Sequence, residues 1–274
     1  MSLAAKLPWT HRYAKGFPGI GSQTMPTDAD AVDYLTRMAA ADGAGVEVSV
    51  AVAVDEFFAN AKELGVFSAL KACCILAGAR TLEGAVVPVV GTAPTGVNFA
   101  SGDYSRTAGL KGDGTSYLDS GRANDADPQN DNHVAAYVTA GKVAVNNGAL
   151  IGAQNTASAY TMTGTVSYNR GSIGNSAIQI TSAGLYASSR KTQASFLYIR
   201  PPDDAQSLVS NSAIASGFSN NVFVYGYSNS SGSLVSPTDA TVAFYSAGTG
   251  MDSDGLAALD TAVSNLITAI GEAL

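Results

Sequence analysis

The sequence has few of the residues that catalysis and metal binding most often use. Its only histidines are His11 and His133, and no glutamate lies between Glu83 and Glu272. Acid–base chemistry in that long stretch would need aspartates, and a Ser-His-Asp triad would have to include His133. A phosphate-binding loop, a nucleophile elbow and a paired-cysteine zinc motif are all missing. We therefore predict that the protein is not an enzyme and, calcium aside, uses no cofactor.

Cysteine is equally scarce. The two cysteines, Cys73 and Cys74, are neighbours in an apolar run. A disulfide needs its two Cα atoms farther apart than most adjacent residues allow. We expect two buried free thiols, which indicates folding in a reducing cytoplasm.

Long apolar runs and basic clusters are missing too. No run reaches the length of a membrane span, and the N-terminus lacks the continuous apolar core of a signal peptide. The formal net charge is −7, whereas a face that follows a nucleic-acid backbone needs clustered Lys and Arg. We predict neither a membrane span nor nucleic-acid binding.

Glycine, tyrosine and small polar residues are plentiful. The chain has 29 glycines and 12 tyrosines, and 46% of its residues are hydrophobic, which together favour many short strands around a sizeable core. One clear alternation runs over 160–168, with tyrosine, methionine and valine on one face and hydroxyls on the other. Similar segments at 194–200, 222–228 and 241–246 predict an antiparallel sandwich of two sheets.

Helices are predicted at both ends of this sandwich. The segment 27–41 has Thr27 and Asp30 as a capping box, 48–64 carries an apolar stripe, and 66–73 reads as a further short helix. The segment 254–274 has a wide apolar stripe, which would be buried against the same chain or form a seam between subunits. We divide the chain into an N-terminal arm (1–26), a helical subdomain (27–81), a sandwich (82–251) and a C-terminal helix (252–274).

The stretch 103–122 predicts the first hairpin of the sandwich. Short strands at 108–110 and 116–119 flank a Lys-Gly-Asp-Gly sequence at 111–114, where glycine supplies the positive φ of a tight reversal. The following segment, 124–132, has almost no apolar side chain, so we expect a solvated loop at a rim.

Four stretches resemble a group of tailed-phage virion proteins that carry a few helices followed by a sandwich. They are CILAGARTL (74–82), VGTAP (90–94), GDYSR (102–106) and NDADPQN (124–130). The resemblance covers roughly 55–274, and the 103–122 stretch looks like the opening of a laminin-G-like or concanavalin-like jelly roll. It implies a mainly β fold, an antiparallel jelly-roll sandwich between a helical subdomain and a C-terminal helix. It also implies a structural component of the virion, with other capsid or tail proteins as partners.

A calcium site is one candidate on this sandwich. The carboxylates of Asp125, Asp127 and Asp131 gather in one loop, and Ca²⁺ prefers such oxygen ligands. Laminin-G-like folds often hold calcium at a rim. The spacing does not fit an EF-hand, and a solvated loop of Asx-turns is the alternative.

A glycan site is the second candidate. Tyr225, Tyr227 and Asn229 place aromatic faces beside an amide, and sugars present C–H faces together with hydroxyl edges. Tyrosines at alternate strand positions also serve as ordinary packing residues, and the strand register decides between the two roles.

The N-terminal arm is the third candidate. It has three aromatics in nine residues, Trp9, Tyr13 and Phe17, together with Arg12. Its net charge is about +3, from Lys6, Arg12 and Lys15 with no acid, so the rest of the chain carries −7 − 3 = −10. Such a segment would anchor the protein to a larger virion partner, or it would be a disordered tail.

The resemblance implies a fibre, spike or decoration subunit of a phage virion that attaches through its N-terminal region and contacts a host-surface polysaccharide. A homo-oligomer, such as a trimer, fits this role. A purely architectural cement protein and a polysaccharide depolymerase are the alternatives.

Overall fold

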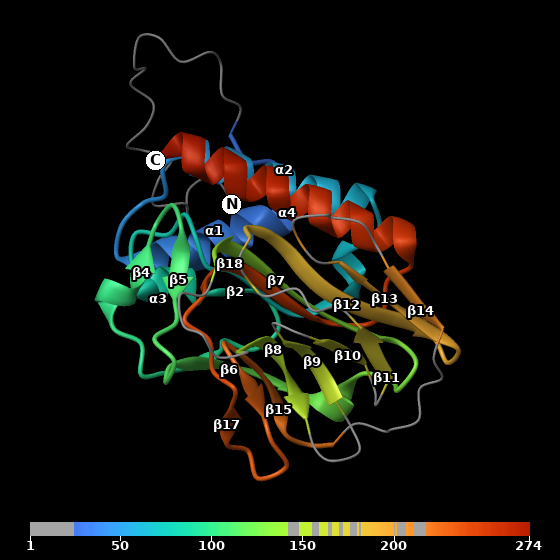
Figure 1. Cartoon of the computed structure of the whole chain (residues 1–274). Helices are drawn as coiled ribbons and strands as arrows, with labels where there is room; N and C mark the ends of the chain where they lie inside the picture. The colour runs from blue at the N-terminus through green and yellow to red at the C-terminus, as the bar shows by residue number, and fades with distance from the viewer. Residues whose placement is uncertain are drawn as a thin grey trace.

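The computed structural model describes residues 25–141, 148–154, 159–163, 166–169, 172–175, 180, 182–199, 201, 207–210 and 218–274. The described chain is mainly β. It has two sheets, a helical N-terminal region and a C-terminal helix. Figure 1 shows the long helices α2 and α4 on one side, one sheet beneath them and the second sheet beyond it.

The helices follow the predicted apolar stripes closely. They are α1 Ala29–Asp42, α2 Val48–Glu63, the single turn α3 Leu82–Ala85 and α4 Ser253–Ala273. Asp28 caps α1 by accepting hydrogen bonds from the backbone of Asp30 and Ala31, so the predicted role of Thr27 as the cap is wrong. Gly43, at φ 63°, ends α1 in the left-handed conformation.

Sheet A is the middle layer. Its order is β14 (Ser207–Ser210), β13 (Ser195–Ile199), β12 (Gly184–Thr192), β7 (Asn132–Ala140), β18 (Thr241–Gly248), β1 (Leu70–Ile75) and β2 (Pro88–Val90). Two short strands, β5 (Gly109–Lys111) and β4 (Tyr104–Ser105), extend from β18. The strand pairings of this sheet in the described chain are antiparallel, and β7 and β18 run side by side at its centre.

Sheet B is the outer layer. Its order is β11 (Ser172–Asn175), β10 (Val166–Asn169), β9 (Ala159–Thr163), β8 (Ala149–Gln154), β15 (Asn221–Val224), β6 (Tyr117–Ala123) and β3 (Thr95–Val97). A small hairpin, β16 (Tyr227–Ser228) with β17 (Leu234–Val235), joins it through one parallel bridge between β16 and β8. Two mainly antiparallel sheets are therefore present, and the finer assignment to a jelly roll stays a prediction.

Sheet A is buried on both faces, so the molecule has two cores. One core lies between the sheets and includes Leu110, Val134 and Val242. The other lies between sheet A and the helices and includes Phe57 and Phe244, whose rings meet edge to face at 5.9 Å. Because the strands of sheet A contact apolar layers on both sides, they lack the alternation of a half-exposed strand.

The helix predicted over 66–73 is wrong. A single turn at Phe67–Ala69 leads directly into strand β1, which pairs with both β18 and β2. Five of the six side chains of β1 are buried. A short apolar run of this kind fits a buried strand as well as a helix, and only its neighbours decide between them.

The hairpin predicted over 103–122 is also wrong, although both of its strands exist. Strand β5 pairs with β18 in sheet A, whereas β6 pairs with β3 and β15 in sheet B. The segment between them crosses from one sheet to the other. Asp113 stabilises this crossing by accepting hydrogen bonds from the backbone of Thr115 and Ser116, both at 2.7 Å. These backbone hydrogen bonds stabilise the charged carboxylate and are the main reason that the Asp113 pKa is lowered to about 2.

The single strand predicted over 160–168 is two strands. β9 and β10 pair antiparallel, with Met162 opposite Ser167 and Thr161 opposite Tyr168. The predicted strands at 194–200 and 241–246 correspond to β13 and β18, and 222–228 divides into β15 and β16. Among the described residues, no helix has both the length and the apolar character needed to cross a membrane.

Candidate functional site

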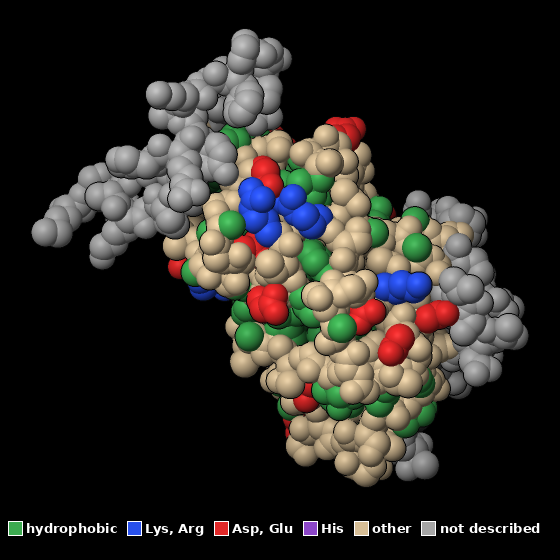
Figure 2. Space-filling view, turned by 90° about the vertical axis from the view of Figure 1, so that its left-hand side faces the viewer, with side chains coloured by type: hydrophobic (Ala, Val, Ile, Leu, Met, Phe, Trp, Pro, Cys, Tyr) green, Lys and Arg blue, Asp and Glu red, His purple; other side chains and the backbone are tan. Residues whose placement is uncertain are grey.

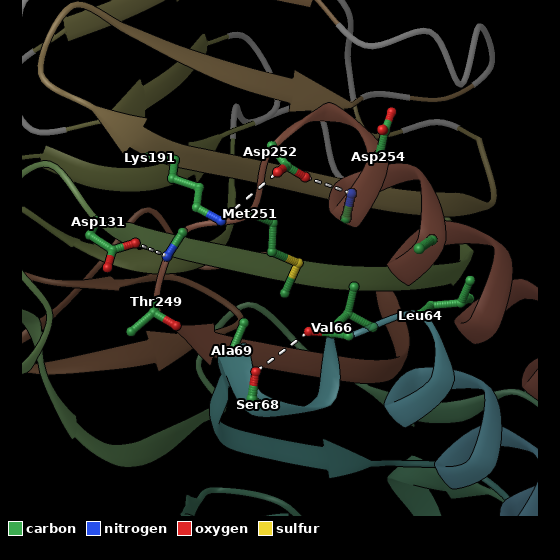
Figure 3. Close-up of a pocket in the computed structure, with 14 residues that line it drawn as sticks. Leu64, Val66, Ser68, Ala69, Asp131, Lys191, Thr249, Met251, Asp252 and Asp254 are labelled. Carbon is green, nitrogen blue, oxygen red and sulfur yellow. Dashed lines mark hydrogen bonds and ion pairs between the residues drawn. The ribbon is translucent and has the colours of Figure 1, made fainter.

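A polar pocket of about 440 Å³ opens where α4 begins (Figure 3). Four segments meet there: the end of α2, the residue before β7 (Asp131), the end of β12 and the loop after β18. The walls carry the carboxylates of Asp131, Asp252 and Asp254, the ammonium of Lys191 and the hydroxyls of Ser68 and Thr249. Apolar contributions come from residues that include Leu64, Val66 and Met251.

The loop after β18 shapes this pocket through backbone contacts. Asp131 accepts a hydrogen bond from the Gly250 backbone at 2.8 Å, and Asp252 caps α4 by accepting one from Gly255 at 3.0 Å. A Cβ atom on Gly250 would lie 1.9 Å from the Arg190 carbonyl oxygen. Only glycine fits that close approach, so the path of the loop depends on it.

Lys191 and Asp252 face each other across the pocket. Their charged atoms are 3.9 Å apart, and both side chains are more than half exposed, at 56% and 67%. An exposed pair at this distance contributes little to stability. Both groups are therefore accessible to a ligand.

A buried polar layer supports the pocket from behind. Ser189 accepts a hydrogen bond from the Met251 backbone N–H and donates one to the Met251 carbonyl, both at 2.7 Å. Arg190 is fully buried, donates to the Gln193 carbonyl at 2.9 Å and lies over the Phe196 ring. The Ser189 bonds fasten the loop after β18 to β12, and the Arg190 bond stabilises the turn between β12 and β13.

His133 belongs to the same layer. Its Nδ1 lies 2.7 Å from the Thr249 carbonyl oxygen, and its Nε2 lies 3.0 Å from the Ser246 hydroxyl. Because a carbonyl only accepts, Nδ1 carries the proton and Nε2 accepts from Ser246. Burial lowers the His133 pKa to about 4, so the ring is neutral at pH 7.

The Ser246–His133 pair resembles part of a nucleophile–base arrangement, but both side chains have no exposed surface. A substrate has no access to the Ser246 hydroxyl in this structure. The pair supports the loop that carries Thr249 and Gly250.

Two of the three predicted calcium ligands have different partners in the structure. Asp127 is 5% exposed and binds the Arg122 guanidinium through two contacts, at 2.6 and 2.8 Å, while Asp131 lies at the pocket. Asn124 and Asn132 are also buried, so the expectation of a solvated loop over 124–132 is wrong for its two ends. Within the described ranges, no group of three or more His, Cys, Asp or Glu side chains could hold a metal ion. Calcium binding by Asp125, Asp127 and Asp131 stays a prediction.

The predicted glycan residues divide into one core residue and two at the surface. Tyr225 is fully buried and donates a hydrogen bond to the Leu110 carbonyl at 2.5 Å, so its ring offers no face to a ligand. Tyr227 and Asn229 are half-buried, and Asn229 accepts bonds from the backbone of Ser231 and Ser233 in the β16–β17 turn. Glycan binding by Tyr227 and Asn229 stays a prediction. The anchoring candidates Trp9, Arg12, Tyr13 and Phe17 lie outside the described residues.

Two of the stretches that resemble virion proteins contact each other and fasten the helices to sheet A. Arg106 donates to the Ala79 carbonyl at 3.0 Å and pairs with Glu47 at 2.7 Å, and Tyr104 donates to the same Ala79 carbonyl. Arg80 pairs with Glu47 as well. Their role in this structure is to hold the start of α2 against the sheet.

The pocket residues Lys191, Thr249 and Ser68 were not identified from the sequence. They come from separate parts of the chain and are common residue types, so no local motif marks them. Asp252 was recognisable from the sequence only as a cap of the C-terminal helix and not as a pocket residue.

No family model matches the chain, and no curated protein does. Among solved structures, the fold is similar to the enzymatically active domain of tailspike protein 2 from bacteriophage CBA120, with a TM-score of 0.36 and 14% identity. The match covers 62% of this chain and only 29% of that chain. A likeness this weak fixes neither the fold nor the function.

Proposed function

We propose that this protein is a structural component of a tailed-phage virion, a fibre, spike or decoration subunit that binds a host-surface glycan without cleaving it. The proposal is supported by the four stretches that resemble virion proteins and by the mainly β fold with its helical layer.

The observation that carries the proposal is the placement of an accessible pocket at one end of the helical layer. Helices α2 and α4 are antiparallel. The end of α2 at Leu64 and the start of α4 at Asp252 line the pocket, while Ser49 and Ala273 lie together at the opposite end. A helix of 21 residues spans about 31 Å, so the two ends are well separated. A rigid layer of this length suits attachment at one end and contact with a surface at the other.

The pocket chemistry suits an uncharged polyol. Carboxylates, an ammonium group and hydroxyls match the hydroxyl edges of a sugar, and Val66 and Met251 supply an apolar wall for its C–H face. The pocket has three carboxylates and one ammonium group, and this acidic balance disfavours a strongly anionic ligand. On the face shown in Figure 2, Lys and Arg side chains form small separate groups.

A purely architectural cement protein is the second candidate, because the same fold would serve without a ligand. A depolymerase ranks last. No glutamate lies between Glu83 and Glu272, and the Ser246–His133 pair is sealed in the core.

The test is binding of the full chain to surface polysaccharide from the host. Two variants are compared with the native chain: Ser68→Trp, which fills the pocket, and Lys191→Glu, which replaces its ammonium group by a carboxylate. The matched control is Lys111→Glu, which changes an exposed lysine on β5. We expect each pocket variant to weaken binding at least tenfold and the control to bind normally. Absence of binding by the native chain would favour the cement protein, and release of reducing ends would establish a depolymerase.

A further inference from the structure

A second hollow, of about 290 Å³, lies between the first half of α2 and the end of α4. Its residues follow one stripe of each helix: Ser49, Val52, Ala53 and Glu56 on α2, and Ala269, Glu272 and Ala273 on α4. We call it the α2–α4 groove. Its floor is made of small side chains, and its two glutamates are exposed.

The groove adjoins the point where the arm leaves the body. The backbone N–H groups of Thr27 and Asp28 donate to Asp55 at 3.0 and 2.8 Å, which holds the start of the described chain against α2. Asp55 is the neighbour of Glu56 and lies one turn from Val52. An extended chain covers about 3.3 Å per residue, so the eight residues from Phe17 to Met25 can span about 26 Å.

Charge favours the arm as the occupant. Residues 1–24 contain Lys6, Arg12 and Lys15 and no acid. No ion pair among the described residues involves Glu56 or Glu272. A short tether also gives the arm of the same chain a high effective concentration at this groove.

We propose that the arm of each chain folds back onto its own α2–α4 groove, with Phe17 against the alanine floor and Lys15 beside Glu56 and Glu272. Phe17 is the aromatic nearest to the body, eight residues before Met25, and Lys15 lies close to it in the sequence. The apolar floor covers the ring, and the glutamates meet the ammonium group at the rim. This inference is independent of any glycan or virion partner.

Disulfide trapping in the full chain tests the proposal. Gly16→Cys is combined with Ala269→Cys in the groove, or with Ala257→Cys, an exposed position near the other end of α4, as the matched control. The native cysteines are fully buried and have raised pKa values, so they do not compete. Under mild oxidation we expect the Ala269 pair to close at least tenfold faster than the Ala257 pair, as a product of monomer mass.

Charge reversal supplies the second arm of the test. Lys15→Glu should slow closure at Ala269, Lys15→Glu with Glu56→Lys and Glu272→Lys should restore it, and Lys6→Glu should leave it unchanged. Equal rates for the two cysteine pairs would overturn the proposal. A product of dimer mass would overturn it too, because the occupant would then be the arm of a second copy.

Discussion

At the scale of single residues, the clearest physical constraint is the neutral His133. It has no exposed surface, and its two ring nitrogens contact Ser246 on β18 and Thr249 in the loop that follows. Asp127, Asp131 and Arg122 are the charged groups that act on it. Burial outweighs the attraction of the two carboxylates, and the net effect lowers the His133 pKa.

This lowered pKa predicts a pH-dependent stability. The unfolded chain takes up a proton near the ordinary His pKa of 6.5, whereas the folded chain resists protonation until about pH 4. The neutral, buried His133 therefore contributes fully to folding stability above pH 6.5. As the pH falls from 6.5 to about 4, the free energy of unfolding decreases by about 3 kcal/mol in total. Denaturant unfolding of native protein and His133→Gln from pH 7.5 to 4 checks it. The variant should be less stable at pH 7 and show a flatter slope, and equal slopes would contradict the assignment.

The two adjacent cysteines show how a residue-level prediction can follow from geometry alone. Cys73 faces the helices and Cys74 faces sheet B, since neighbours on a strand point to opposite sides. Both thiols are free and buried, as predicted. Burial raises the Cys74 pKa to about 12, so neither thiol is activated as a nucleophile.

At the scale of elements, the long helices were predictable because their apolar stripes have a clear period. The predicted 48–64 agrees with α2, and 254–274 agrees with α4. Strand β1 was not predictable in this way, because apolar layers on both faces remove the alternation of a strand. The predicted hairpin over 103–122 was wrong for a different reason. The turn chemistry of Gly112 and Gly114 does not specify which sheet receives the next strand.

Because α4 packs against α2, shortening a buried side chain of α4 should lower the stability of the protein strongly. Leu266 is 2% exposed in the core between the helices and sheet A. Leu266→Ala should destabilise the protein by about 2–5 kcal/mol, because it removes buried surface and leaves a cavity. Leu274→Ala, at a 42% exposed position on the same helix region, should cost less than about 0.5 kcal/mol. Thermal and denaturant unfolding measure both, and similar losses would show that α4 does not pack as described.

At the scale of the whole molecule, the sequence predicted a mainly β body with helices at both ends but not its layering. The helices near the N-terminus and the C-terminal helix contribute to the same core on one face of sheet A. Long-range partners such as Phe57 and Phe244 determine that arrangement, and no local pattern specifies them. The candidate site was least predictable, because Ser68, Lys191 and Thr249 come together only through the fold.

We propose that this chain belongs to a phage particle and presents its pocket outward. Mass spectrometry of purified virions, after brief labelling of the intact particles with an amine-reactive reagent, tests it directly. We predict that the chain is present in the particles and that Lys191 is modified. Absence of the chain from purified particles would contradict the claim of a virion role, and a protected Lys191 in particles that contain it would contradict the outward placement of the pocket.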